Sequence, residues 1–164
     1  DGYARLSGKP GVCIVITGPG ITNILTAMAQ ARSDSIPMLV ISGVNTFTKT
    51  FSRRAPLHNL PDQAKLVKQV AIASYTITQI EETFSIVKKA FLKMTSGKPG
   101  PVHIQIPINV MTETMPKTSK FHSIRKKNSS LKKLEVSNIL NAISKSKKRC
   151  IILGGGARSA KETI

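Results

Sequence analysis

Residues 11–20 read GVCIVITGPG, an apolar run that ends in a glycine-proline-glycine turn. The run has no polar alternation, which is typical of a strand buried on both faces of a parallel sheet. After the turn, apolar side chains recur at the spacing of one buried helix face, namely Ile21, Ile24, Leu25 and Met28. Residues 11–32 therefore predict a buried strand, a tight turn and a helix, the repeating unit of an α/β domain.

The turn itself, Gly18-Pro19-Gly20, is a candidate ligand site. Glycine allows the backbone to approach a ligand closely. The start of the following helix offers N–H groups without intrahelical partners and a partial positive charge. A plain connection between a strand and a helix explains the same residues equally well, so the local pattern leaves both interpretations open.

Three further apolar runs predict buried strands, at residues 38–42, 70–77 and 102–107. A short helix is expected at residues 61–68, with Pro61 in its first turn. A longer helix is expected after a capping box formed by Thr78 and Glu81, and it ends before Gly97. This order predicts an α/β fold with an open, doubly wound parallel sheet and helices on both faces. Ligands of such sheets bind beyond the carboxyl ends of the strands, where the glycine turn lies.

The composition changes twice along the chain. Residues 1–113 form the predicted first domain, residues 114–131 a basic linker, and residues 132–164 the start of a second α/β domain. In this second part we expect a helix around residues 136–143, then a strand at residues 150–153 and a glycine turn. The turn, Gly154-Gly155-Gly156, lacks the last glycine of a dinucleotide fingerprint because position 159 is Ser159, which disfavours a nicotinamide-binding domain. We expect the chain to be a piece of a longer protein.

The net charge of +17 raises the question of nucleic-acid binding. Residues 117–149 hold eleven of the 25 basic residues and one acidic residue, as a solvated linker would, so a basic nucleic-acid-binding fragment is only the alternative from another class. No membrane span and no signal peptide are recognisable, so we expect a cytoplasmic protein that contacts neither a membrane nor nucleic acid. Cys13 and Cys150 lie in apolar runs and are expected to be buried, reduced thiols, although a disulfide between them stays open.

A polar segment after the second predicted strand is a candidate pocket. It contains His58, Asn59 and Gln63, and loops on rigid scaffolds often carry function. No other histidine or cysteine stands at metal-ligand spacing from His58, so no metal site is predicted. An ordinary loop histidine is the simpler interpretation of His58.

The segments DGYARLSGKPGV (residues 1–12), TGPGITN (17–23), DSIPM (34–38) and SGKPGPV (96–102) together resemble thiamine-diphosphate enzymes of the acetolactate synthase and 2-oxo acid decarboxylase group. The segment DGYARLSGKPGV (residues 1–12) is similar to the stretch that precedes the family's glycine turn, and TGPGITN (residues 17–23) is similar to the turn. DSIPM (residues 34–38) is similar to the entry of the family's second strand, and SGKPGPV (residues 96–102) with Ile106-Pro107 is similar to the domain end. These matches keep the family's order over residues 1–112, and the glycine triplet at residues 154–156 resembles the start of its central domain.

The resemblance implies a domain that binds the aminopyrimidine half of thiamine diphosphate. Gly18, Pro19 and Gly20 would then form the cofactor turn, with Pro19 and Gly20 beside the ring, and Asn23 would add a polar contact. The family's catalytic glutamate would lie upstream of Asp1, so no residue present is assigned a catalytic role. The diphosphate and Mg²⁺ would be held by another domain, marked by a Gly-Asp-Gly segment that this sequence lacks. FAD in the central domain stays open.

The implied activity is decarboxylation of a 2-oxo acid and transfer of the resulting acyl carbanion, as in acetolactate synthase, by a homodimer or homotetramer. Residues 57–63 depart from the acetolactate synthase pattern and resemble some decarboxylases of the group, including those that act on guanidino-oxo acids. A simple 2-oxo acid decarboxylase is therefore the alternative. By itself, a chain of this length is expected to be inactive.

Overall fold

The computed structural model describes residues 1–45, 57–116 and 133–160. The chain divides into two compact units, Asp1–Lys126 and Lys127–Ile164, which we call unit 1 and unit 2. Unit 1 contains a four-stranded sheet and its helices.

The sheet of unit 1 is parallel throughout. Its strands are β1 (Gly11–Val15), β2 (Met38–Val44), β3 (Ala73–Thr76) and β4 (Pro101–Pro107). They lie in the order β1-β2-β4-β3, and every pairing between neighbours is parallel. The register sets Val40 beside His103 and Ser42 beside Gln105. The predicted open, doubly wound α/β fold is confirmed.

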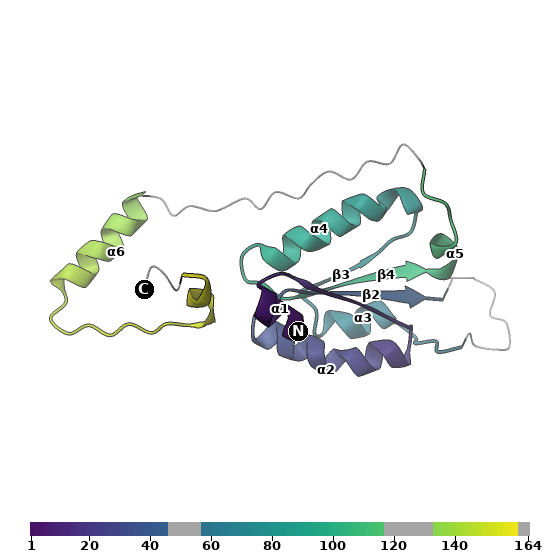
Figure 1. Ribbon diagram of the computed structural model, residues 1–164, viewed down its shortest axis with the longest axis horizontal. Coiled ribbons are helices and arrows are strands. Elements are labelled where there is room, and N and C mark those ends of the chain that lie inside the picture. Colours follow the sequence, from purple (N-terminus) through teal and green to yellow (C-terminus); the bar gives the residue numbers. More distant parts are fainter. Residues whose placement is uncertain (46–56, 117–132, 161–164) are drawn as a thin grey trace. The chain divides into compact units, whose positions relative to one another are not determined.

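Helices cover both faces of this sheet (Figure 1). On one face lie α2 (Pro19–Ser33) and α3 (Gln63–Lys68), and on the other lies α4 (Thr83–Thr95), which follows a 3₁₀ turn, η1 (Ile80–Glu82). Two short helices, α1 (Gly2–Ser7) and α5 (Ile108–Met111), adjoin β1 and β4 respectively. The sequence did not predict either of them.

Each face of the sheet has its own hydrophobic core. Under α2 and α3 the buried residues are Ile21, Met28, Ala31, Met38, Val40, Val67 and Ala71. Under α4 they are Leu39, Ile77, Ala90, Met94, Val102, Ile104 and Val110. Successive residues of a strand point to opposite faces, which is why Val40 and Leu39 belong to different cores. The predicted helix face of α2 is confirmed by the burial of Ile21 and Met28.

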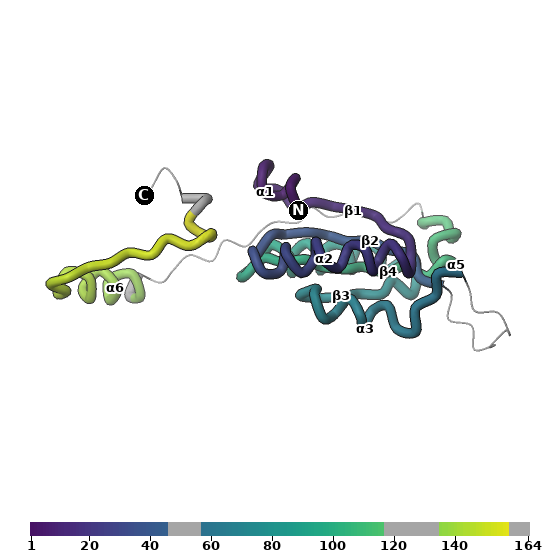
Figure 2. Tube along the Cα trace, turned by 90° about the horizontal axis from the view of Figure 1, so that it is seen from below, coloured from purple at the N-terminus to yellow at the C-terminus, as the bar shows by residue number. Residues whose placement is uncertain are grey.

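One expectation for β1 is wrong. Val12, Ile14 and Ile16 are 54, 75 and 58% exposed, so the strand is not buried on both faces. The reason is that β1 lies at the edge of the sheet. Figure 2 shows β1 there, beside α1. The helix α4 packs on β2, β3 and β4. Only the α2 face of β1, which carries Cys13 and Val15, packs against a core.

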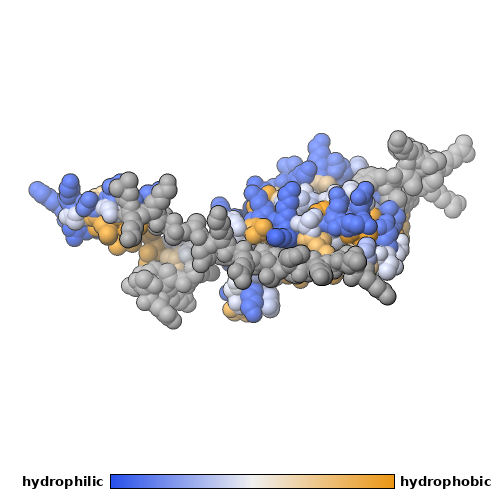
Figure 3. All heavy atoms as spheres, turned by 90° about the horizontal axis from the view of Figure 1, so that it is seen from above, coloured by the Kyte–Doolittle hydropathy of each residue, from blue (hydrophilic) through white to orange (hydrophobic). Residues whose placement is uncertain are grey.

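The outer face of α4 is basic. Lys88, Lys89 and Lys93 are exposed there, and the Lys89 ammonium lies 5.4 Å from the centre of the Tyr75 ring. Seen from this side, unit 1 is mostly hydrophilic with apolar patches between the polar groups (Figure 3). A polar outer face opposite a buried apolar face is typical of a helix that packs on a sheet.

Several element boundaries differ from the sequence prediction. The strand expected at residues 70–77 is shorter because Val70 and Ala71 both donate to the carbonyl of Val67 and close the turn after α3. The helix α3 begins after Asp62, whose carboxylate accepts from the Lys65 N–H at 2.8 Å, so Pro61 lies before the cap. The predicted capping box at Thr78 uses Glu82 in place of Glu81.

Glu82 replaces Glu81 in capping Thr78. Its carboxylate accepts from the backbone N–H and the hydroxyl of Thr78 at 3.1 and 2.9 Å. These hydrogen bonds hold the pKa of Glu82 below its usual value. The intervening 3₁₀ turn moves the acid one residue along the chain, which a sequence pattern with fixed spacing does not anticipate.

Unit 2 is described only in residues 133–160. The predicted helix is confirmed as α6 (Lys133–Lys145), and Gly155–Ala160 forms a 3₁₀ helix, η2. The predicted strand at residues 150–153 is wrong, because these residues are exposed and pair with no strand in the part of the chain that the structure describes. Cys150 is exposed as well, contrary to expectation, and both cysteines are free. No helix in the described ranges is long and apolar enough to span a bilayer.

His103 in β4 gives the fold a pH dependence. It has no exposed surface, and burial lowers its pKa to about 4. The unfolded chain, with a histidine pKa near 6.5, therefore binds more protons than the folded chain between these two values. The free energy of unfolding is therefore unaffected by His103 above about pH 6.5, and it decreases as the pH falls from about 6.5 to about 4.

We expect the free energy of unfolding, measured by urea titration, to be about 2 kcal/mol lower at pH 5 than at pH 7 because of His103. The His103→Gln variant should lose most of this dependence, although it is less stable than the parent at pH 7. An unchanged pH dependence in the variant would contradict the assignment.

Candidate functional site

The glycine turn lies where β1 ends and α2 begins. Gly18 is the residue before the helix, with φ 64° and ψ −108°, and Pro19 is the first helical residue. Gly18 is buried, whereas Pro19 and Asn23 are exposed and Gly20 is half-buried. A ligand at this turn would thus meet Pro19 and the first turn of α2, whose N–H groups have no intrahelical partners.

Packing within the chain accounts for both glycines of the turn. A Cβ atom on Gly18 would overlap the carbonyl oxygen of His58 and lie 2.9 Å from the His58 Cβ. A Cβ atom on Gly20 would lie 2.9 Å from the Ile16 Cγ2 and 3.2 Å from the Val15 Cβ. The positive φ of Gly18 adds a backbone reason. The glycines therefore shape the turn, and the surface open to a ligand is that of Pro19 and Asn23.

The side-chain amide of Gln63 joins this turn to the end of β2 by hydrogen bonds. We call this arrangement the Gln63 clamp. Its Oε1 accepts from the Thr17 hydroxyl at 2.7 Å and from the Gly18 N–H at 3.3 Å. Its Nε2 donates to the Ser42 hydroxyl and to the Gly43 carbonyl, both at 3.0 Å. A backbone N–H only donates and a carbonyl only accepts, so the orientation of the amide is unambiguous.

The structure brings the predicted pocket segment to the glycine turn. His58 adopts φ 59°, a left-handed conformation, and its backbone lies against Gly18 while its side chain is exposed. Asn59 is also exposed. Gln63 is 3% exposed, so it supports the turn from inside and does not line an open pocket. Asn45, at the end of β2, donates to the Leu57 carbonyl at 3.3 Å and ties this segment to the sheet.

The polar partners of the Gln63 clamp were not predicted from the sequence. Thr17, Ser42 and Gln105 are each less than a tenth exposed and lie at or near the carboxyl ends of strands. The Gln105 Oε1 lies 3.4 Å from the Gln63 Nε2, whose two hydrogens are donated mainly to Ser42 and Gly43, and the Gln105 Nε2 donates to the Thr76 hydroxyl at 3.0 Å. Polar residues that alternate with apolar ones inside a predicted buried strand were the available signal, because buried polar groups need partners.

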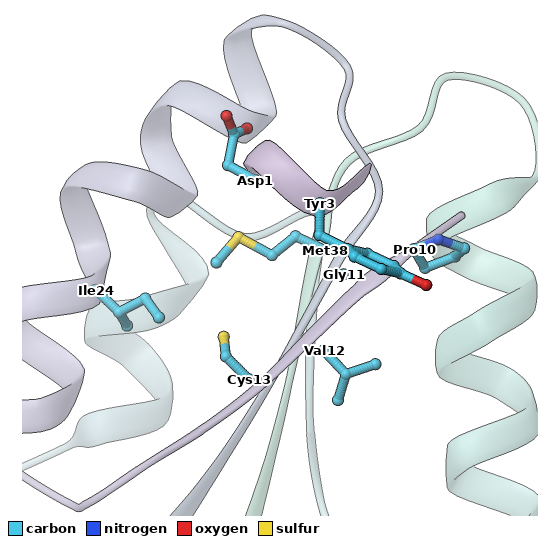
Figure 4. Close-up of a pocket in the computed structure, with 8 residues that line it drawn as sticks. All are labelled: Asp1, Tyr3, Pro10, Gly11, Val12, Cys13, Ile24 and Met38. Atoms are coloured by element: carbon cyan, nitrogen blue, oxygen red, sulfur yellow. The ribbon is translucent and has the colours of Figure 1, made fainter. Parts of the chain in front are cut away.

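A cavity of about 590 Å³ opens at the other end of β1. Figure 4 shows Cys13, Ile24 and Met38 on one side of it, with Tyr3 and Pro10 among the remaining lining residues. Burial raises the pKa of the Cys13 thiol, which keeps it protonated and unreactive near neutral pH. The cavity lies at the amino end of β1, whereas the glycine turn begins at Gly18, beyond the carboxyl end of the strand, so the two are separate features.

The described residues offer no catalytic metal centre. No group of three or more histidine, cysteine, aspartate or glutamate side chains is placed to hold an ion within residues 1–45, 57–116 and 133–160. The carboxylate nearest to the clamp in sequence, Asp62, caps α3.

Known proteins match this chain in part. Residues 1–66 match the thiamine pyrophosphate enzymes' N-terminal TPP binding domain. The chain is 44% identical over 111 residues to a probable 2-ketoarginine decarboxylase of Pseudomonas aeruginosa, a match that covers 68% of this chain and 20% of that protein. It is 34% identical over 172 residues to the acetolactate synthase large subunit of Buchnera aphidicola, covering 99% of this chain and 29% of that protein.

A chloroplastic acetolactate synthase of Arabidopsis thaliana is 29% identical over 177 residues, covering 100% of this chain and 25% of that protein. The chain therefore spans between 20 and 29% of the length of these relatives.

Replacement of Gly18 tests the shape of the turn. We expect Gly18→Ala to lower the free energy of unfolding by on the order of 3 kcal/mol, because the methyl group meets the His58 backbone at a positive φ. Gly97→Ala is the matched control, since Gly97 has φ 66° but nothing within 4 Å of its Cβ position. It should cost about 1 kcal/mol in the same urea titration. Equal losses in the two variants would show that His58 does not pack on the turn.

Proposed function

Because this chain is similar to thiamine pyrophosphate enzymes, among them acetolactate synthases and a probable 2-ketoarginine decarboxylase, we propose that residues 1–113 bind the aminopyrimidine ring of thiamine diphosphate. The observation that carries the proposal is the turn at Gly18. It is held rigidly by the Gln63 clamp, yet it leaves Pro19 and Asn23 exposed beside the start of α2.

The residues of the turn fit such a ring. Pro19 offers a flat apolar surface, and the exposed Asn23 offers an amide that can donate to or accept from a ring nitrogen or amino group. The Gln63 clamp orders Gly18 before any ligand arrives, which reduces the entropy lost on binding. Gly18 and Gly20 act through the shape of the turn, and His58 and Asn59 would border the ligand from the neighbouring loop.

When bound, thiamine diphosphate supplies an electron sink for the loss of carbon dioxide from a 2-oxo acid. This chain contributes binding and orientation, and the proposal assigns no catalytic side chain to it. The diphosphate and Mg²⁺ would be held by polypeptide outside this sequence, in a homodimer or homotetramer. FAD would belong to the central domain if the enzyme uses it. We propose a cytoplasmic enzyme, with no nucleic acid or membrane among its partners.

Two fates of the decarboxylated substrate compete. Transfer of the acyl carbanion to a second oxo acid would make the enzyme acetolactate synthase-like, and this is supported by similarity over 99% of the chain. Protonation would make it a simple decarboxylase, and this is supported by the 44% identity to the probable 2-ketoarginine decarboxylase. The departure of residues 57–63 from the acetolactate synthase pattern favours the second fate.

The full-length protein tests both fates. With thiamine diphosphate and Mg²⁺ present, we expect release of carbon dioxide from at least one of pyruvate, other aliphatic 2-oxo acids and 2-ketoarginine, with acetolactate formed only by a synthase.

Asn23→Ala should raise the Kd for thiamine diphosphate about tenfold, the cost of one hydrogen bond. The matched control is Thr26→Ala, an exposed residue one turn further along α2, which should leave the Kd unchanged. A wild-type protein that neither binds the cofactor nor releases carbon dioxide would refute the proposal.

A further inference from the structure

A second set of polar side chains extends the Gln63 clamp across the sheet. The Ser42 Oγ lies 2.8 Å from the His103 Nε2, and the Ser74 Oγ lies 2.9 Å from the His103 Nδ1. The three residues sit on β2, β4 and β3, and we call them the serine–histidine chain. His103 and Ser42 are 0 and 1% exposed, so water does not compete for these hydrogen bonds. The serine–histidine chain therefore links β3, which lies at the opposite edge of the sheet from β1, to the Gln63 clamp.

The direction of these hydrogen bonds follows from the clamp. The Gln63 Nε2 donates to the Ser42 Oγ, so the Ser42 hydroxyl keeps its own hydrogen for another acceptor. Among the described contacts, the acceptor for this hydrogen is the His103 Nε2. The proton of the ring then resides on Nδ1 and is donated to the Ser74 hydroxyl. The opposite tautomer would leave the buried hydroxyl hydrogen of Ser42 without an acceptor among these contacts, which is unfavourable.

We propose that His103 is a positioning residue for the glycine turn. Its Nε2 fixes the Ser42 hydroxyl, the hydroxyl holds the Gln63 amide, and the amide holds the N–H of Gly18. The role in cofactor binding rests on the proposed function, whereas the role in ordering the turn does not. Burial also keeps the imidazole neutral at physiological pH, as the acceptor role of Nε2 requires.

Two substitutions of His103 separate this role from simple packing. A glutamine places its amide near the position of Nε2 and can still accept from Ser42. An asparagine places its amide near the position of Nδ1, so it keeps only the contact with Ser74. Both remove the ring and should lower the melting temperature by similar amounts. Only His103→Asn breaks the link to the clamp.

The readouts are hydrogen exchange and cofactor affinity of the full-length protein. In the absence of cofactor, His103→Asn should raise the exchange rate of the peptide covering residues 15–21 by about tenfold, and His103→Gln by less than about twofold. The Kd for thiamine diphosphate should change in the same pattern. Equal exchange and equal Kd in the two variants would reduce His103 to a packing residue and overturn the proposal.

A double-mutant cycle covers the case in which His103→Asn does not fold. The smaller change Ser42→Ala should speed exchange at residues 15–21 about tenfold by itself. His103→Leu, which removes the acceptor nitrogen, should speed exchange to a similar extent, and the double variant should exchange no faster than either single variant, because His103 acts through Ser42. An unchanged exchange rate in Ser42→Ala, or additive effects in the double variant, would contradict the proposal. If the wild-type protein binds no thiamine diphosphate, the proposed function fails while the exchange measurement still decides the role of His103.

Discussion

One buried amide, that of Gln63, holds the carboxyl end of the sheet together. It joins the Gly18 turn to the end of β2 through four hydrogen bonds in which donors and acceptors are matched. Such a group must be fully paired, because a buried polar atom without a partner costs more than a hydrogen bond gains. The amide binds Gly18, the residue before α2, and the backbone of His58 packs against Gly18 in turn.

This constraint explains how a glycine turn can be both rigid and open. Gly18 is closed off by the His58 backbone and Gly20 by Ile16, so the backbone cannot relax toward a ligand. Pro19 and Asn23 remain exposed on a support that is already ordered. Preorganisation of this kind lowers the entropy cost of binding and suits a cofactor whose other contacts come from elsewhere in the polypeptide.

Sequence patterns predicted the α/β fold and the position of the glycine turn. They did not predict the hydrogen bonds of Gln63 that support the turn. Apolar runs located the strands because buried parallel strands need such runs, but they could not show that β1 is an edge strand with Ile14 exposed. The sequence predicts a pocket role for Gln63 because a polar residue in a loop is usually exposed. Its partners Thr17 and Ser42 are distant in the sequence and come close to Gln63 only in the tertiary fold. Hydrogen-bonding networks between strands depend on register, which no single segment encodes.

A structure of the full-length protein with thiamine diphosphate bound tests the central claim most directly. We predict that the aminopyrimidine ring lies against Pro19, within hydrogen-bonding distance of Asn23, while Gln63 still binds the Gly18 N–H. A structure in which protein side chains cover Pro19 and Asn23, with the cofactor bound elsewhere or not at all, would contradict it.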